Sequence, residues 1–352
     1  MTRRSILQTR HALWRVLVAT VLVLPFGCAA PSPRGLQRSG TQLVWPPAPA
    51  PPRIRYAGQL QSSADVERPG GFVRAFGEFI VGKREPQRMY GPRAVCCTHG
   101  GDRVWVADPG GRRVHVFDLA RNTYQAISRM GDAALLSPVD VTAGPNETLL
   151  LCDSEAVAVH QVSVPDGSFV RTLRLPEDIL RPVALRYEHA RGELFVVDAV
   201  AHDIKVLDMT GRLLRIVGRR GDGPAEFNFP CEIAEREGTL WVVDAGNHRI
   251  QGLTPTGRAI EQFGQEGDAP GDLALPKGIA FDSHGHAYVV DSRFENVQIF
   301  DASGRLLLFF GHEGTGEGEF WLPSGVFVDE NDRIWVCDTY NGRLQAFDYV
   351  GP

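Results

Sequence analysis

Six aspartates recur along the sequence at nearly constant spacing, and their carboxylates are the first candidates for chemistry. They are Asp108, Asp153, Asp198, Asp244, Asp291 and Asp338, which are 45, 45, 46, 47 and 47 residues apart. Each follows an apolar run and precedes a polar turn, where an Asp side chain accepts hydrogen bonds from backbone amides. A calcium loop would need denser oxygen ligands at fixed spacing. We therefore expect all six to be structural turn residues.

The spacing of the aspartates reflects a repeated unit of short strands. Each unit holds a hairpin such as "AYVVDSRFENVQIFD" (287–301), a run such as "GRLLLFFG" (304–311), and then a proline followed by a run such as "LPKGIAFD" (275–282). Self-similarity at about 40–50 residues is typical of propellers and solenoids. Four strands per unit correspond to one propeller blade.

The two ends of the repeat array predict how the ring closes. The sixth unit stops after its third strand, and the alternating segment "RIRYAGQL" (53–60) stands alone before the first unit. Pairing of these two segments would complete six blades and remove an exposed sheet edge. We therefore predict an all-β, six-bladed β-propeller over residues 53–352, with four-stranded antiparallel blades closed by the N-terminal strand.

The repeats resemble those of NHL-repeat propellers. The segments "LWVVDAGNHRIQ" (240–251) and "IWVCDTYNGRLQAFD" (334–348) match the family pattern best, with Asn-x-Arg after the turn aspartate. The second and third units lack this Asn-x-Arg. The resemblance covers roughly residues 91–352. It implies the fold strongly and the function weakly, because propellers host unrelated activities.

Function in a propeller usually lies where the inner strands begin, at one mouth of the central channel. Four charged residues follow the inner-strand prolines: Arg93, Asp140, Glu232 and Lys277. We interpret them as a ligand- or partner-binding site at the channel mouth. The alternative is two structural ion pairs, Arg93 with Asp140 and Glu232 with Lys277, in a wet channel.

Enzymes of this fold provide a test for catalysis. In the peptidyl-amidoglycolate lyase, zinc-binding histidines directly follow the inner-strand proline, and none of the six equivalent positions here is histidine. Lactonases similar to gluconolactonase need several acidic and asparagine ligands for calcium, whereas the channel offers two acids, Asp140 and Glu232. His202, His248 and His312 share the predicted mouth face, which permits a metal site without requiring one. We therefore expect neither a catalytic residue nor a cofactor; a hydrolase or lyase using calcium or zinc is the alternative.

The cysteines are more consistent with buried thiols than with metal or redox chemistry, because no C-x-x-C motif is present. Cys152 and Cys337 occupy equivalent positions in the two blades that flank the Cys96–Cys97 pair. A disulfide from that pair to either of them is the alternative, and its formation depends on Cα separations that a sequence does not give.

The N-terminal region predicts export. Residues 1–27 contain four arginines, no acidic residue and an apolar run too short to span a bilayer, which is typical of a secretory signal peptide. The run ends in "LVLPFGC", which resembles a bacterial lipobox and implies lipidation of Cys28. The Pro-Phe pair before the glycine departs from the lipobox pattern, so an ordinary cleaved signal or a retained anchor is the alternative. The residues after Cys28 favour the outer membrane in a bacterium that has one.

Two further segments fall outside the repeats. Residues 28–52 are rich in proline, which predicts a semi-rigid tether between membrane and propeller. Residues 61–90 form an insertion in which "GGFVRAFGEFIVGKR" (70–84) has apolar residues at helical spacing. We expect a short amphipathic helix there, either packed on the propeller or in contact with a partner or membrane surface.

Composition agrees with an exported binding protein. The formal net charge is −5 and becomes −9 when the four signal arginines are removed, and no basic stripe points to nucleic acid. We therefore expect a lipid-anchored propeller of the cell envelope that binds or scaffolds a protein or glycan partner. The oligomeric state stays open.

Overall fold

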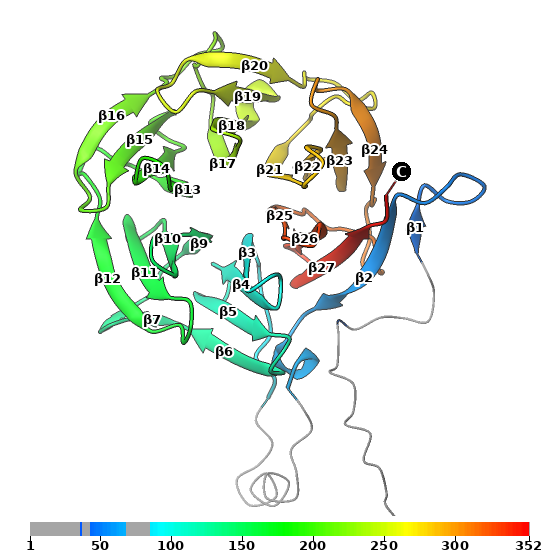
Figure 1. Cartoon of the computed structure of the whole chain (residues 1–352), viewed down its shortest axis with the longest axis horizontal. Helices are drawn as coiled ribbons and strands as arrows, with labels where there is room; N and C mark the ends of the chain where they lie inside the picture. Colours follow the sequence, from blue (N-terminus) through cyan, green and yellow to red (C-terminus); the bar gives the residue numbers. More distant parts are fainter. Residues whose placement is uncertain (1–35, 37–42, 68–84, 352) are drawn as a thin grey trace, which may run out of the picture. The chain divides into compact units, whose positions relative to one another are not determined.

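The propeller is seen in a computed structural model that describes residues 36, 43–67 and 85–351. Six antiparallel sheets stand around a common axis, each with one strand at the centre (Figure 1). The predicted six-bladed β-propeller is therefore confirmed. The predicted signal peptide, Cys28 and the predicted amphipathic helix lie outside the described residues.

Five blades are continuous in sequence, and each is a four-stranded meander that runs from the channel outward. Their strands are β3 (Ala94–Thr98), β4 (Arg103–Asp108), β5 (Arg113–Asp118) and β6 (Thr123–Ile127); β9 (Pro138–Ala143), β10 (Thr148–Asp153), β11 (Ala158–Ser163) and β12 (Phe169–Arg174); β13 (Pro182–Glu188), β14 (Glu193–Asp198), β15 (Asp203–Asp208) and β16 (Leu213–Val217); β17 (Pro230–Arg236), β18 (Thr239–Asp244), β19 (Arg249–Leu253) and β20 (Ala259–Phe263); β21 (Pro276–Phe281), β22 (Ala287–Asp291), β23 (Asn296–Phe300) and β24 (Leu306–Phe310).

The sixth blade joins the two ends of the chain, as predicted. It contains β25 (Val326–Val328), β26 (Arg333–Asp338) and β27 (Arg343–Tyr349), and its outer strand is β2 (Ile54–Leu60) from the N-terminal region. The antiparallel register between β2 and β27 runs from Ile54 opposite Tyr349 to Leu60 opposite Leu344. This pairing closes the ring with a strand far away in sequence.

A fifth strand in this blade was not expected. β1 (Val44–Trp45) pairs with β2, although it falls in the segment predicted to be an extended tether. The Trp45 ring lies 5.9 Å from Phe310 and 5.8 Å from Phe347 between ring centroids. Aromatic packing against these two rings explains why this part of the Pro-rich segment lies on the blade.

The remaining elements are short. The ribbon of β7 (Arg129–Met130) and β8 (Ala133–Ala134) and the 3-10 turn η1 (Ser63–Asp65) lie between blades, whereas the 3-10 turn η2 (Ala245–Asn247) lies in the hairpin between β18 and β19 of the fourth blade. Within the described ranges, no helix has the length and apolar character needed to cross a membrane.

The core is divided into clusters that each lie between two neighbouring blades. Trp105 of β4 belongs to one cluster with Leu149 of β10, and Phe347 of β27 to another with Tyr288 of β22. The second strand of each blade is therefore covered on both faces and reads as a continuous apolar run. Outer strands such as β16 and β24 alternate between exposed and less exposed residues, because one face meets solvent.

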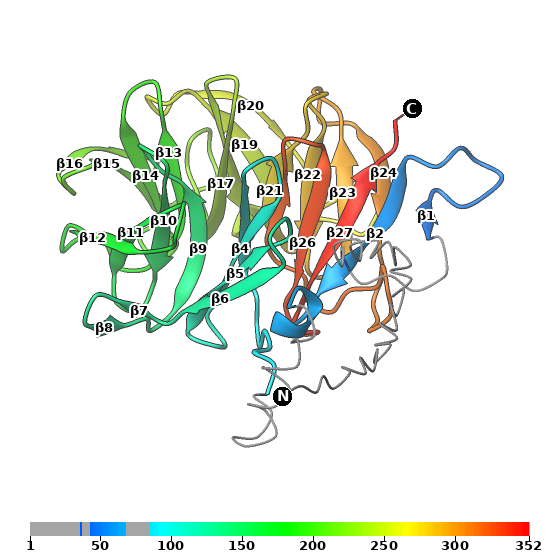
Figure 2. The ribbon, with the colours of Figure 1, turned by 60° about the horizontal axis from the view of Figure 1, so that its bottom comes forward.

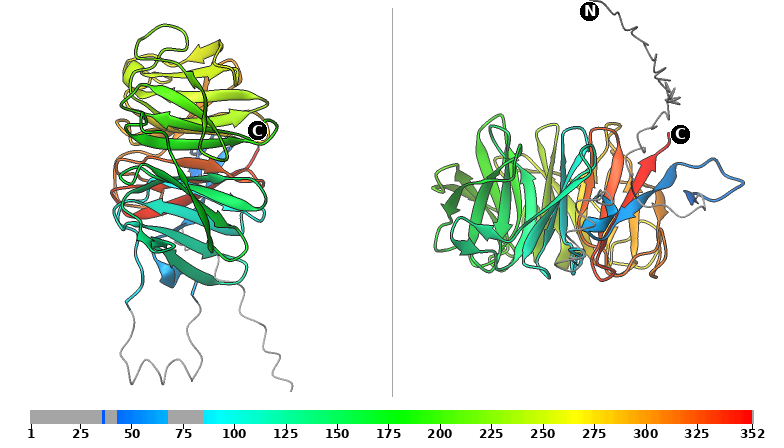
Figure 3. Two further views of the ribbon diagram at one scale, coloured as in Figure 1. Left: turned by 90° about the vertical axis from the view of Figure 1, so that its left-hand side faces the viewer. Right: turned by 90° about the horizontal axis from the view of Figure 1, so that it is seen from below.

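The strands run along the channel axis, so turns and strand ends form its two mouths (Figures 2 and 3). Antiparallel pairing places the end of each second strand beside the start of the inner strand, as in Asp153 opposite Pro138 and Asp198 opposite Pro182. The six turn aspartates therefore share one face with the starts of the inner strands. We call this the anchor face.

On the anchor face, each turn aspartate is fully buried and accepts hydrogen bonds from the backbone that leads into the inner strand. Asp108 accepts from Tyr90 and Gly91, both at 2.9 Å, and also from Gly111 within its own turn. Equivalent bonds reach Asp153, Asp198, Asp244, Asp291 and Asp338. Each carboxylate thus fixes the point at which its inner strand begins.

Two of these anchors carry an additional cation. Arg343 donates to Asp338 at 2.6 Å and to the backbone oxygens of Gly316 and Glu319. Arg249 does the same for Asp244 in the fourth blade. In the second blade, by contrast, Asp153 accepts backbone N–H groups alone.

This difference predicts unequal costs for the same substitution. Asp338→Asn should lower the free energy of unfolding by about 3–5 kcal/mol, because it leaves the buried Arg343 guanidinium without its counter-charge. Asp153→Asn should cost about 1–3 kcal/mol, the range for a lost buried hydrogen bond. Urea unfolding of the two variants measures the difference, and equal losses would contradict the role given to Arg343.

Candidate functional site

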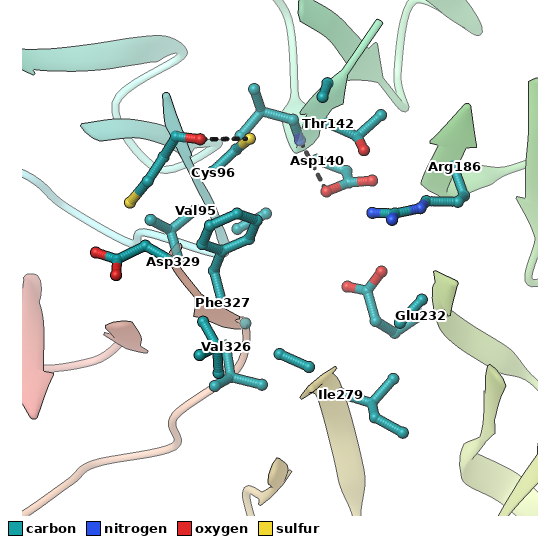
Figure 4. Close-up of a pocket in the computed structure, with 18 of the residues that line it drawn as sticks. Val95, Cys96, Asp140, Thr142, Arg186, Glu232, Ile279, Val326, Phe327 and Asp329 are labelled. Carbon is teal, nitrogen blue, oxygen red and sulfur yellow. Dashed lines mark hydrogen bonds between the residues drawn. The ribbon is translucent and has the colours of Figure 1, made fainter. Parts of the chain in front are cut away.

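A cavity of about 350 Å³ occupies the central channel. Inner-strand residues from all six blades line it, and Figure 4 shows how their side chains converge. It is the place where side chains from distant parts of the sequence meet, and we take it as the candidate functional site.

Two of the four predicted mouth residues line the cavity. Asp140 and Glu232 point into it from β9 and β17. Arg93 and Lys277 lie at the starts of their inner strands but do not line it. Among the described residues, neither Arg93 with Asp140 nor Glu232 with Lys277 comes within the 4.0 Å of an ion pair.

Bulges at the inner-strand starts place the two acids. Pro138 lies opposite Asp153 and Asp140 opposite Cys152, so the residue between them has no partner. The same irregularity precedes Glu232 in the fourth blade. A bulge re-aims the side chains that follow it, which here turns both carboxyl groups toward the channel axis.

Arg186 is the basic residue of the cavity that sequence reasoning missed, together with the acids Glu235, Asp329 and Glu330. Its guanidinium points toward the space between Asp140 and Glu232 (Figure 4), while its Nη2 lies 3.5 Å from Glu235. The residues two positions after Ala94, Asp140, Ala184, Glu232, Gly278 and Gly325, which are equivalent in the six blades, also line the cavity: Cys96, Thr142, Arg186, Ala234, Ala280 and Phe327. Strand alternation would have indicated this second layer.

The two channel carboxyl groups are held by backbone amides. Asp140 accepts from Val141 at 2.7 Å with one oxygen and from Leu185 of the next blade at 2.6 Å with the other. Glu232 accepts from Ile233 at 2.9 Å. Burial raises the pKa of Asp140 to about 6. Burial, followed by the nearby charge of Asp140, raises the pKa of Glu232 well above its usual range.

The channel wall is divided by polarity. Asp140, Arg186 and Glu232 occupy the side formed by the second to fourth blades, whereas Ile279, Val326 and Phe327 occupy the opposite side (Figure 4). On that opposite side Asp329 and Glu330 also line the cavity, directly after the end of β25. The cavity therefore offers a charged wall and a largely apolar wall to anything that enters it.

The histidines and cysteines form no comparable site. His202 accepts the Phe229 N–H at 2.9 Å, His312 lies 3.5 Å from Glu319, and His248 lies 4.0 Å from Glu266. No group of three or more metal-ligating side chains occurs in the described part of the chain. The five cysteines described, Cys96, Cys97, Cys152, Cys231 and Cys337, are free thiols, and burial raises the pKa of Cys96 to about 12 and that of Cys231 to about 11.

Seven exposed apolar side chains, contributed by every blade except the fifth, lie on the anchor face. Five stand in the crossovers that lead into inner strands, and two stand in hairpin turns: Tyr90, Leu136, Leu180, Val200, Phe229, Trp321 and Tyr340. Tyr90 is 68% exposed and Tyr340 62%. The rings of Trp321 and Tyr340 are in contact, 5.7 Å apart between centroids. We call this set the mouth ring.

A family model for the NHL repeat matches residues 320–347. This stretch runs from the crossover into the last blade to the end of its third strand, and it contains the Asp338 anchor with its arginine. The chain is a six-bladed β-propeller whose last blade matches the NHL repeat. The resemblance drawn from the sequence is thereby confirmed for the repeat and the fold. No curated protein matches the chain.

Solved structures similar to this NHL-repeat propeller have diverse functions. Virginiamycin B lyase from Staphylococcus aureus shares 15% identity at a TM-score of 0.54, covering 74% of this chain and 96% of its own. An auxiliary nutrient binding protein from Bacteroides thetaiotaomicron shares 14% at 0.58, covering 75% and 70%. The calcium-binding protein regucalcin from Agrobacterium tumefaciens shares 16% at 0.54, covering 73% and 90%. At these identities the similarity shows the fold alone.

The raised pKa of Glu232 predicts how stability depends on pH. A carboxyl group whose pKa is higher in the folded than in the unfolded state destabilises the fold as pH rises through that interval. Glu232→Gln should therefore stabilise the propeller relative to wild type at pH 8, with no such gain at pH 4, because the amide keeps the oxygen that accepts from Ile233.

Urea unfolding midpoints at both pH values measure this effect. The exposed Glu261→Gln on β20 is the control and should show no comparable change between the two pH values. A Glu232→Gln variant that loses stability at pH 8 relative to pH 4 would mean that Arg93 or Arg186 stabilises the Glu232 anion, contrary to this prediction.

Proposed function

We propose that this NHL-repeat propeller is an exported binding platform, lipid-anchored at the cell envelope, that recognises a partner with its anchor face. The mouth ring is the observation that carries this proposal. Single exposed apolar residues are normal on protein surfaces, but a group gathered on one face is typical of an interaction site. Here seven such residues, contributed by every blade except the fifth, lie on the anchor face.

The composition of the mouth ring favours a protein partner over a glycan. Trp321, Tyr340, Tyr90 and Phe229 are aromatic, and Trp and Tyr dominate the energetics of protein interfaces. Leu136, Leu180 and Val200 add aliphatic side chains on other blades, so the surface is broad as well as apolar. Such a surface suits a protein face, and a glycan is the alternative that the test must separate.

Charges at the channel mouth would supply specificity. Arg93 and Lys277 lie at the starts of β3 and β21, inside the mouth ring, and Asp140 and Glu232 lie just below the mouth. Charged groups within an apolar surface select the partner and its orientation more than they raise affinity. This keeps all four sequence-predicted residues in the proposed partner site.

A metal-dependent hydrolase or lyase is less well supported than a binding platform. Lyases and a calcium-binding protein are among the fold's neighbours. Calcium takes about six to eight oxygen ligands. The acids that line the described channel do not gather into a group of three or more that could hold a metal ion.

The first prediction of this proposal concerns the mouth ring. The double variant Trp321→Ser, Tyr340→Ser should weaken partner binding at least about 30-fold, because paired aromatic residues are typical hot spots. Crosslinking in the intact envelope, followed by mass spectrometry, measures capture by each variant.

The matched control is Leu214→Ser, Ile216→Ser, which removes two similarly exposed apolar residues from the outer strand β16. A partner kept by the control and lost by the ring variant supports the anchor face. Equal capture of the partner by both variants would show that the mouth ring does not take part in partner binding. Capture of an envelope polysaccharide, with no protein, would assign the site to a glycan.

The second prediction concerns the anchor. Cys28→Ser should move the protein from the membrane fraction to the soluble fraction, since diacylation of this cysteine is the proposed attachment. Metabolic labelling with a radioactive fatty acid, followed by fractionation, measures both consequences. A Cys28→Ser protein that stays with the membrane would point to a retained apolar anchor instead.

A further inference from the structure

The charged wall of the channel contains two carboxyl groups without a cationic partner. Asp140 and Glu232 accept backbone N–H groups, and no Lys, Arg or His nitrogen lies within 4.0 Å of either among the described residues. A carboxylate oxygen can accept two hydrogen bonds, so both groups keep unused acceptor capacity. Buried charges are normally paired.

The arginine nearest in the channel does not fill this role. Arg186 makes its one ion pair with Glu235, at 3.5 Å, and its Nε is buried without a hydrogen-bond partner. Asp329, which directly follows β25, has no cation within 4.0 Å among the described residues either, but it accepts from the Trp335 indole at 2.9 Å with one oxygen and from two backbone amides with the other. Glu330 is exposed to solvent. Asp140 and Glu232 are therefore the buried acids of the described cavity that have the fewest hydrogen-bond donors and no cation within ion-pair distance.

The space in front of these acids has the size and lining of a small-molecule site. A cavity of about 350 Å³ lies at the lower end of the range for ligand pockets, about 300–1,000 Å³. Ile279, Val326 and Phe327 face the acids from the opposite wall (Figure 4). A ligand that fits must therefore be charged at one end and apolar at the other.

We infer that the channel binds a small organic cation, with an ammonium or guanidinium group at Asp140 and Glu232 and an apolar group against Phe327 and Ile279. An anion is disfavoured because five acids and one arginine line the cavity: Asp140, Glu232, Glu235, Asp329, Glu330 and Arg186. A bare metal ion is disfavoured because no group of three or more metal-ligating side chains occurs among the described residues.

This cation could come from two sources with the same chemistry. It is either a free amine or the Lys or Arg side chain of a partner docked on the anchor face. The free-amine case does not rest on the proposed function, because it needs no partner.

Calorimetric titration of the purified full-length protein with phenethylamine tests the free-amine case. The uncharged analogue 2-phenylethanol has the same ring and nearly the same size, and should bind at least 10-fold more weakly because it carries no charge for the two acids. This comparison uses wild-type protein and so does not depend on a variant folding.

Variants locate the site. Glu232→Gln should weaken phenethylamine binding at least 10-fold, while Glu330→Gln, an exposed acid of the same channel, should change it less than 2-fold. The ring variant Trp321→Ser, Tyr340→Ser should leave amine binding unchanged, so failure of the partner site and failure of the amine site are distinguishable.

A second probe separates the two sources. The peptide acetyl-Leu-Lys-Leu-amide carries its one positive charge on a lysine side chain. If wild-type protein binds the peptide but not phenethylamine, and Glu232→Gln loses peptide binding, the site is supported and the cation is assigned to a docked chain. Binding of neither probe would overturn the inference, as would equal affinities for phenethylamine and phenylethanol or equal losses in Glu232→Gln and Glu330→Gln.

Discussion

The fold depends on one interaction made six times, the hydrogen bonds from a buried aspartate to the backbone that enters its blade. The crossover between blades is an irregular loop whose amide groups must find partners once they are buried. Asp108 supplies them for Tyr90 and Gly91, and the other anchors act in the same way. These bonds set where each inner strand starts, so the width and lining of the channel follow from them. In the sequence the six aspartates looked most like a functional signature. In the structure they do not line the cavity, but they position the inner strands whose side chains do.

The contrast between the anchors and the channel acids separates structure from recognition. Each anchor carboxylate accepts several donors, and Asp338 also binds Arg343 and Gln345. Asp140 and Glu232 share the channel, lack a cation within ion-pair distance and have raised pKa values because of burial. Keeping such groups buried costs stability, and perturbed carboxyl groups in a cavity are typical of functional sites. Buried carboxyl groups thus have two roles in this propeller. Those of the anchors accept several hydrogen bonds and fix the backbone, whereas those of the channel accept fewer and face the cavity.

The fold could be predicted from the sequence because its determinants are local and repeated. The period of the aspartates, the apolar runs and the spare segment 53–60 indicated the six blades and the pairing of β2 with β27. The site was harder to predict, because side chains converge there from six strands about 45 residues apart. The charged residues at the starts of the inner strands were found by their position after each proline. The ion pairs of Arg93 with Asp140 and of Lys277 with Glu232, which were the alternative interpretation, do not form among the described residues. Arg186 was missed because the alternation of side chains between the two faces of a strand was not followed to the next inward-facing residue of β13. The mouth ring was missed because the solvent exposure of a side chain is not visible in a sequence.

The asymmetry of the channel follows from the space between neighbouring inner strands. Asp140 and Glu232 occupy one position in their blades, and the equivalent positions elsewhere hold Ala94, Ala184, Gly278 and Gly325. At Gly278 an added Cβ would lie 2.6 Å from the Ser324 carbonyl oxygen, and at Gly325 it would overlap the Arg93 carbonyl. The inner strand of the fifth blade therefore lies too close to that of the sixth, and that of the sixth too close to that of the first, for a side chain at Gly278 or Gly325. A carboxyl-bearing side chain fits at this position only where the neighbouring inner strand is far enough away. The close backbone contacts at Gly278 and Gly325 therefore exclude carboxyl groups from that side of the channel, and Asp140 and Glu232 lie on the opposite side. Asp140, Arg186 and Glu232 therefore stand opposite the apolar side chains of Ile279, Val326 and Phe327, and this contrast would orient the organic cation that we infer to bind there.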